Sequence, residues 1–456
     1  MTTVLKNQIE ALHQDCRVLV LTGDPAGARL PVPVVAIPGL AYSDPARKAD
    51  ASEDVADAVV KAIHSFFRGP CDVLHVHNPT LAKNTSFQEI LKALQNRQVC
   101  LFLQIHDFAE DGRPQVYFAD EYVADCHYGV VNLRDYEILI RAGLKPDGVH
   151  RLPNALSLRN LQRGGMDGHC KKVLYPIRAI RRKNIGEAIL VSLFLAMGDT
   201  LAITLPPNSP ADFKSYHDWK GFVQRHNLPV EFDKGLRHDF GHLLQSCSFL
   251  ITTSITEGFG FCFIEPWLSD KLVWGRKLPG VCRDFEDNGM RLEHLYPRLD
   301  VPLDWIDADA FFDTWRACIL RVAQQFSFPV SETQTLEAFT AVTSEGRIDY
   351  GLLQERFQQQ VVARLLASNA NRAILTDLNP FLSTVGSVPG AAQLIHHNRQ
   401  AVLEHYGLQQ YRKRLLAIYA AVASRPITQR INKSILLSQF LDLSQFSLLK
   451  WDVYNG

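Results

Sequence analysis

The chain has 456 residues, too many for one ordinary hydrophobic core, and a usual domain size of about 100–200 residues predicts two or three domains. Its 46% hydrophobic and 21% charged residues are typical of a globular protein and exclude a disordered chain. Because 48 Lys and Arg residues balance 48 Asp and Glu residues, no net charge attracts nucleic acid or anionic lipid.

The nine cysteines are scattered and odd in number, and none forms a C-x-x-C pair, which favours reduced thiols in the cytoplasm. Residues 1–10 lack a secretory signal pattern, and no apolar run approaches the roughly 20 residues that cross a bilayer. We therefore expect a cytoplasmic protein with no strong membrane signal.

Helix and strand patterns alternate in the first half of the chain. Helices are expected at 4–12, 54–67 and 86–94, and strands at 17–22, 32–37, 73–76, 99–105 and 128–131. Such alternation predicts βαβ units and a parallel sheet. The first element is a helix rather than a strand. Either the polypeptide starts upstream of Met1, or this sheet lacks an edge or inner strand.

A second alternating series follows a polar, glycine-terminated linker at about 156–165. Strands are expected at 172–175, 201–205, 230–232, 249–252 and 271–273, with helices at 186–196, 213–226, 240–245 and 262–268. The prediction is an α/β protein of two doubly wound domains that face each other across a cleft. The first covers 1–160 and the second 166–395, with a helical insertion at about 291–394 in which strands are hard to find. Carboxy-terminal helices at 396–456 cross back to the first domain.

The strongest motif is SITEGFGFCFIEP at 254–266, directly after the apolar strand 249–252. Gly258 and Gly260 allow the backbone to approach a ligand, and the expected helix would offer free N–H groups to a phosphate. Glu257 and Glu265 can accept hydrogen bonds from sugar hydroxyls. Taken alone, this is an ordinary strand-loop-helix connection in which one Glu caps the helix and the other is solvated.

A second motif is VLYPIRAIRRKN at 173–184, where several cations follow a strand. A basic run is commonly a solvated surface, but ligands bind at the carboxyl ends of strands in open α/β sheets. These cations are therefore candidates for an anion site.

A third group lies in the first domain, DVLHVHNP at 72–79 and QIHDF at 104–108. His75 and His77 share one face of a strand, but no third ligand follows at metal-site spacing, so we predict no metal site. A structural histidine is the alternative for each. The Asp307-Ala308-Asp309 sequence matches the D-x-D pattern of metal-dependent enzymes, but it opens a helical pattern, where Asp is expected as a cap.

Together these motifs resemble the retaining glycosyltransferases of family 4, whose fold is GT-B. The resemblance covers about residues 4–290 and the last helices, and includes Leu152-Pro153-Asn154-Ala155 at the end of the first domain. It implies that Glu257 contacts the transferred hexose and that Glu265 binds the ribose. Gly258, Phe259, Gly260 and Phe261 complete the expected donor site.

The resemblance further assigns the donor diphosphate to Arg178 and Lys183, five residues apart, although Ile177 stands where the family has Gly before the Arg. It places His106 near the transferred sugar, and His77 with Asn78 near the acceptor. The cations would stabilise the charge that develops on the leaving diphosphate, so no divalent metal and no cofactor are expected.

The expected reaction is therefore transfer of a hexose, glucose or mannose, from a UDP-, GDP- or ADP-sugar to a hydroxyl of a small or soluble acceptor, with retention. The alternatives are a sugar-nucleotide epimerase, a phosphorylase, or a degenerate partner subunit without activity, which the missing opening strand would favour.

Overall fold

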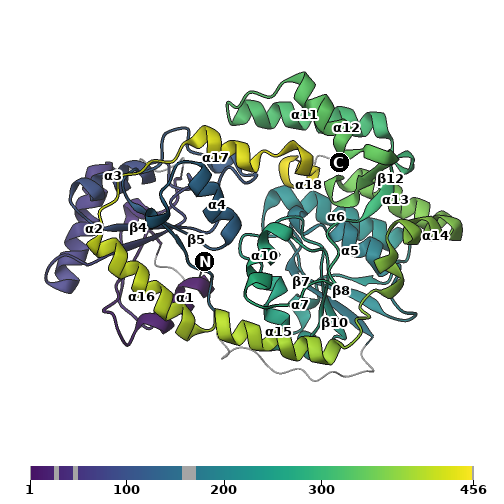
Figure 1. Ribbon diagram of the computed structural model, residues 1–456, viewed down its shortest axis with the longest axis horizontal. Coiled ribbons are helices and arrows are strands. Elements are labelled where there is room, and N and C mark those ends of the chain that lie inside the picture. Colours follow the sequence, from purple (N-terminus) through teal and green to yellow (C-terminus); the bar gives the residue numbers. More distant parts are fainter. Residues whose placement is uncertain (1, 25–29, 45–49, 157–170, 454–456) are drawn as a thin grey trace. The chain divides into compact units, whose positions relative to one another are not determined.

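The computed structural model describes residues 2–24, 30–44, 50–156 and 171–453 (Figure 1). The chain divides into a first unit, Met1–Ser157 with Glu404–Leu441, and a second unit, Leu158–Leu403 with Asp442–Gly456. The linker predicted at 156–165 lies outside the described residues apart from Leu156. The carboxy-terminal segment 396–456 is divided between the two units instead of forming one block, because its successive helices pack on different cores.

Four parallel strands form the main sheet of the first unit, in the order β3-β4-β5-β6: β3 (Leu74–His77), β4 (Leu101–Ile105), β5 (His127–Val130) and β6 (Val149–Arg151). Every residue of β4 is buried, as expected for a parallel strand that is covered on both faces. Strand β6 was not expected, because Val149-His150-Arg151 has no apolar run.

Helices cover this sheet: α2 (Ser52–Phe67), α3 (Phe87–Asn96), α4 (Leu133–Arg141) and α17 (Lys433–Phe440). On the other side, α1 (Thr2–Leu12) packs against α16 (Leu408–Ser424), and both contribute to one apolar cluster with Phe102 of β4. A helix near the end of the chain thus completes the core that the amino-terminal helix begins (Figure 1).

Two further strands, β1 (Val20–Thr22) and β2 (Val34–Ala36), form a separate parallel pair. Strands β1 and β3 line the same cavity of about 700 Å³, together with α1 and α16. The backbone N–H groups of Leu21, His75 and His77 find no backbone partner among the residues that the structure describes. The first unit, as described, therefore has a gap in its sheet between β1 and β3, the position of an inner strand. We call this gap the strand gap.

The second unit contains a five-stranded parallel sheet in the order β11-β10-β7-β8-β9. Its strands are β7 (Lys172–Arg178), β8 (Thr200–Leu205), β9 (Val230–Glu231), β10 (Phe249–Thr252) and β11 (Val273–Gly275). The connecting helices are α5 (Ile185–Ser192), α6 (Pro210–Arg225), α7 (Lys234–Arg237), α8 (Phe240–Gln245), α9 (Glu265–Leu268) and α10 (Pro279–Asp287). This is the predicted alternation, with the carboxyl ends of β7 and β10 side by side.

The helical insertion expected at about 291–394 also contains two strands. Strand β12 (Asp300–Pro302) precedes helices α11 (Ala308–Gln325) and α12 (Glu332–Val342), and it pairs in antiparallel fashion with β13 (Arg347–Asp349). Helices α13 (Glu355–Ala367), α14 (Asn369–Leu378) and α15 (Ala391–Tyr406) follow β13. Asp307 accepts a hydrogen bond from the backbone N–H of Ala310 and caps α11. The D-x-D pattern is therefore a helix start.

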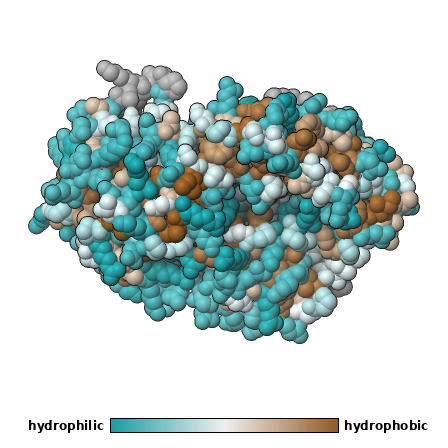
Figure 2. Space-filling view, turned by 45° about the horizontal axis from the view of Figure 1, so that its top comes forward, coloured by the Kyte–Doolittle hydropathy of each residue, from teal (hydrophilic) through white to brown (hydrophobic). Residues whose placement is uncertain are grey.

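The end of the chain returns to the second unit as α18 (Leu448–Trp451), where Trp451 stacks on Phe446. In the surface view of Figure 2, hydrophobic side chains are interspersed among hydrophilic ones. Within the described ranges, no helix is long and apolar enough to cross a membrane.

Candidate functional site

The donor motif lies in the second unit, where the chain leaves β10. The carbonyl of Thr252 accepts the N–H of Arg276, and the loop that follows carries Ser254 and Glu257. A neighbouring turn, Arg181–Lys183, follows β7 and carries the basic run. Because β7 and β10 are paired neighbours, both motifs meet at one edge of the sheet.

Lys183 and Glu257 form an ion pair between Nζ and Oε1, with 16% and 11% of their side chains exposed. Burial alone would raise the pKa of Glu257, but the charges of Lys183 and Arg182 outweigh it, and the net pKa is lowered. Glu257 is therefore an anion at neutral pH. The sequence placed the two residues in one site by resemblance, and the structure brings them into direct contact.

Arg178 is the last residue of β7 and is exposed. Its guanidinium has no ion-pair partner in the part of the chain that the structure describes. Arg181 behaves differently, since it is 8% exposed and forms a bidentate pair with Glu355 of α13 at 2.6 and 2.8 Å. Of these two arginines, the accessible cation is thus Arg178.

Gly260 has a left-handed backbone with φ of 86°. A Cβ at this position would lie 2.7 Å from Cγ1 of Val281 and 3.0 Å from Phe263, so only glycine fits. Phe259 is 7% exposed and packs edge-to-face on Phe261 and Phe285. The Phe259 ring therefore anchors the loop in the core, while Gly258 and Phe261 are partly exposed beside it.

The helix expected at 262–268 is much shorter in the structure. A 3-10 turn at Phe261–Phe263 and the four-residue helix α9 replace it, because Ile264 leaves the helical conformation with φ of −123°. A single turn has little macrodipole, so the expected phosphate site at this helix start stays a prediction that depends more on the loop's backbone N–H groups than on a helix dipole. Arg182 and Lys183 of the neighbouring turn are the cations that lie beside this loop.

Glu265 begins α9 and is exposed, yet the protein around it removes enough water from the carboxylate to raise its pKa to about 7. No ion pair to this carboxylate occurs among the described residues. Glu265 is accessible, and its carboxylate oxygens can accept hydrogen bonds from a ligand.

The candidate residues of the first unit, His77, Asn78 and His106, also lie in contact with one another. Nδ1 of His77 lies 2.9 Å from Nε2 of His106, and Oδ1 of Asn78 accepts the backbone N–H of His106 at 2.8 Å. Burial, with the charge of nearby histidine rings, lowers the pKa of His77 and of His106 to about 3, so both are neutral. His75 stacks on His77 at 4.4 Å. In the described ranges, no group of three or more His, Cys, Asp and Glu residues could hold a metal ion.

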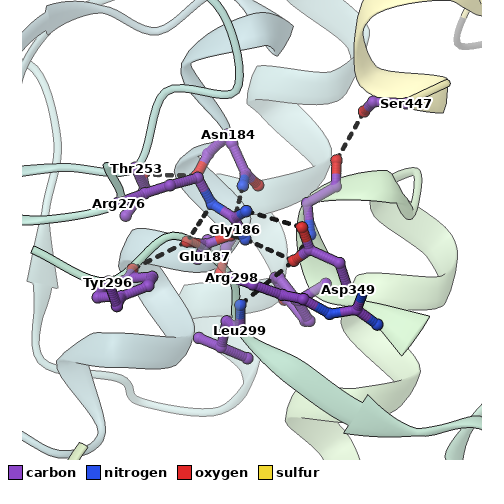
Figure 3. A network of polar contacts seen from close by, with 12 residues as sticks. Asn184, Gly186, Glu187, Thr253, Arg276, Tyr296, Arg298, Leu299, Asp349 and Ser447 are labelled. Atoms are coloured by element: carbon purple, nitrogen blue, oxygen red, sulfur yellow. Dashed lines mark hydrogen bonds and ion pairs between the residues drawn. The ribbon is translucent and has the colours of Figure 1, made fainter. Parts of the chain in front are cut away.

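Sequence reasoning missed a set of buried polar residues in the second unit (Figure 3). Arg276 forms bidentate pairs with Glu187 at 2.8 and 2.6 Å and with Asp349 at 2.8 and 2.7 Å. Glu187 is fully buried and also accepts hydrogen bonds from Asn184 and Tyr296. We call Arg276, Glu187 and Asp349 the buried ion cluster. No motif in the sequence marks these three residues, because each lies in a different segment of the chain and they meet only in the folded protein.

Comparison with known proteins shows similarity over about half of the chain to one relative, and over almost the whole chain to solved structures. No protein-family model matches the chain. Mannosylglucosyl-3-phosphoglycerate synthase of Petrotoga mobilis is 30% identical over 246 residues, which are 46% of this chain and 47% of that protein. The match thus spans about half the length of the relative.

Solved glycosyltransferases match almost the whole chain. A glycosyltransferase from Rickettsia africae matches with a TM-score of 0.53 at 10% identity, over 93% of this chain and 94% of that one. Anabaena HepE, solved in complex with UDP-glucose, matches with a TM-score of 0.53 at 13% identity, over 92% and 95%. The chain has the GT-B glycosyltransferase fold. The sucrose-phosphate synthase of Thermosynechococcus elongatus shares this GT-B fold, with a TM-score of 0.50 at 14% identity over 92% and 91%.

Proposed function

We propose that the chain is a retaining glycosyltransferase that moves a hexose from a nucleotide diphosphate sugar to a hydroxyl of a soluble acceptor. The observation that carries the proposal is the Lys183–Glu257 ion pair at the carboxyl edge of the second sheet of a GT-B fold. It places a cation and a carboxylate where that fold can hold a phosphate and a sugar.

In the proposed reaction, Arg178 and Lys183 neutralise the charge that develops on the departing diphosphate. Fixed charges of this kind need no reorganisation during the reaction, which is why they lower the barrier. The ionised Glu257 orients the hexose, and Glu265 accepts hydrogen bonds from the ribose. The departing phosphate takes the acceptor proton at the front face, so no enzyme nucleophile and no metal are proposed.

The relatives support a choice of donors and acceptors to test. HepE was solved with UDP-glucose, and the Petrotoga mobilis relative is named for a product that contains mannosyl, glucosyl and 3-phosphoglycerate groups. We therefore propose glucose or mannose as the hexose, with UDP, GDP or ADP as the nucleotide. A small phosphorylated sugar acid is a suitable acceptor to include.

The test begins with thermal-shift measurements against UDP-glucose, GDP-glucose, ADP-glucose and GDP-mannose. A ligand at 100 times its Kd stabilises the folded state by about 2.7 kcal/mol, so the true donor should stand out. The selected donor is then assayed for transfer to an acceptor panel. Binding without transfer to any acceptor would favour the inactive partner subunit, and no binding at all would contradict the proposal.

Lys183→Ala provides the residue-level test. Loss of one charge-stabilising group should lower kcat about 10²–10³-fold, measured as nucleotide release with the selected donor. Lys220→Ala is the matched control, because Lys220 also pairs with a carboxylate in the second unit, Asp233 at 2.7 Å, away from the motif. Turnover by Lys183→Ala within a few-fold of wild type would rule out the assigned role.

A further inference from the structure

Tyr175 lies inside the basic motif but points into the protein. It is on β7, and its side chain is fully buried. Its hydroxyl donates to the carbonyl of Lys183 at 2.6 Å and accepts the backbone N–H of Thr253 at 3.2 Å. One hydroxyl therefore joins the turn that carries Lys183 to the loop that carries Glu257.

A second hydroxyl strengthens the same junction. Oγ1 of Thr253 donates to the carbonyls of Lys183 at 3.3 Å and Asn184 at 2.9 Å. Oγ of Ser254 lies 3.3 Å from the Tyr175 hydroxyl. The backbone on both sides of the Lys183–Glu257 ion pair is thus held by the hydrogen bonds of two hydroxyls, those of Tyr175 and Thr253.

Asn184, directly after the Arg181–Lys183 turn, adds further hydrogen bonds that hold the turn. Asn184 has a left-handed backbone with φ of 50°, and its side chain donates to Glu187 at 2.7 Å and accepts from Gln358 at 2.8 Å. Through Glu187, the turn is connected to the buried ion cluster (Figure 3). Lys183 therefore extends from a backbone held by several hydrogen bonds, and the Tyr175 hydroxyl is one of two hydroxyls, with that of Thr253, that link this backbone to the Glu257 loop.

We propose that Tyr175 is a positioning residue that sets the spacing between Lys183 and Glu257 through its hydroxyl. The inference rests on the proposed function, because it assigns Tyr175 to the donor site described there. Tyr175 touches no reacting atom. Its role matters because a displacement of about 1 Å at a reacting centre can lower a rate about 100-fold.

Tyr175→Phe removes the hydroxyl and keeps the ring, so the core stays filled. We expect kcat to fall about 10–100-fold while the KM for the donor changes less than threefold, because Arg178 and Glu265 remain in place. Tyr216→Phe is the matched control. Tyr216 is 2% exposed in the same unit, and its hydroxyl bonds to Asp233 at 2.6 Å. Tyr216→Phe should keep wild-type kcat.

A double variant distinguishes positioning from general support. If Tyr175 acts through Lys183, adding Tyr175→Phe to Lys183→Ala should leave kcat at the value of Lys183→Ala alone. A further drop of tenfold or more would mean that Tyr175 acts independently of Lys183, and would overturn the inference. Equal kcat for Tyr175→Phe and wild type would also overturn it.

A chemical measurement keeps this inference separate from the proposed function. The rate at which an amine-acetylating reagent modifies Lys183 is followed by peptide mass spectrometry, with Lys220 as the internal standard. Tyr175→Phe should accelerate modification of Lys183 several-fold and leave Lys220 unchanged. That result with an inactive wild type would uphold the positioning role while the proposed transfer failed. An unchanged rate at Lys183 would refute the positioning role whether or not the wild type turns over.

Discussion

Glu265 is a residue whose ionisation should change near neutral pH. Its pKa is raised from the ordinary value of 4.5 to about 7 by loss of water around the carboxylate. The folded state therefore binds this proton more tightly than the unfolded state does. The resulting stability is fully present below about pH 4.5 and is lost as the pH rises through about 7.

We predict that Glu265→Gln removes this dependence. The melting temperature of the variant should exceed that of wild type by an amount that grows between about pH 4.5 and 7 and then stays constant. Scanning calorimetry from pH 4.5 to 8.5 measures the difference. A constant difference across that range would show that Glu265 titrates normally.

At this scale, the sequence predicted part of the candidate site. Lys183 and Glu257 were placed together because each lies in a motif that follows a strand and resembles the donor site of the family 4 glycosyltransferases. Tyr175 was not recognised, because a tyrosine in an apolar run reads as core. The proposed role of Tyr175 depends on two backbone groups that its hydroxyl contacts, the carbonyl of Lys183, 8 residues away, and the N–H of Thr253, 78 residues away. The spacing of residues in the sequence does not reveal these contacts.

Among the elements, the buried ion cluster holds α5, β13 and the end of β11 together. Arg276 is 4% exposed, and Glu187 is fully buried. Removing one partner of a buried ion pair leaves an uncompensated charge, which costs about 3–5 kcal/mol. Arg276→Ala should therefore lower the free energy of unfolding by about that amount in urea titrations.

Arg283→Ala is the control for this prediction. Arg283 lies nearby in the sequence but forms an exposed pair with Asp287 at 3.9 Å. Exposed pairs contribute about 0–1 kcal/mol, so this variant should be near wild type. Equal stability of the two variants would show that the buried ion cluster contributes little.

The strand gap gives a second prediction for an element. Backbone N–H groups of Leu21, His75 and His77 lack backbone partners among the described residues, whereas Leu74 and Asn78 donate to β4 at 2.8 Å. In this 456-residue chain, hydrogen exchange followed by mass spectrometry should show faster exchange at His75 and His77 than at their even-numbered neighbours. Equal protection of all these amides would mean that the strand gap is filled.

Two elements around the donor motif were predicted with the bounds that the structure gives. The strand at 249–252 and the helix at 240–245 have the expected bounds. The strand expected at 271–273 is instead Val273–Gly275, since Leu272 belongs to the preceding loop. Strands β6, β12 and β13 have three residues each, too few to show alternation, and β12 and β13 pair across the two intervening helices α11 and α12.

At the scale of the whole molecule, neither unit is a single stretch of chain. The chain enters the first unit again at Glu404 and leaves it after Leu441. The final segment of the chain belongs to the second unit, where Arg321 donates a hydrogen bond to the Asp452 carboxylate at 2.7 Å and Arg181 donates one to the Asp452 carbonyl. To predict that the chain passes from one unit to the other and back, one must know which apolar helix face packs against which core. Amphipathic patterns do not specify that.

The return of the chain sets the order in which the protein is completed on the ribosome. Leu12 and Phe102 are covered in part by Leu415 and Ile418 of α16. At about 5–20 residues per second, α16 is made on the order of 10–50 s after Ser157. During that interval the apolar surface of α1 and β4 stays exposed. We therefore expect chaperones to bind nascent chains of intermediate length, in which α16 has not yet been made.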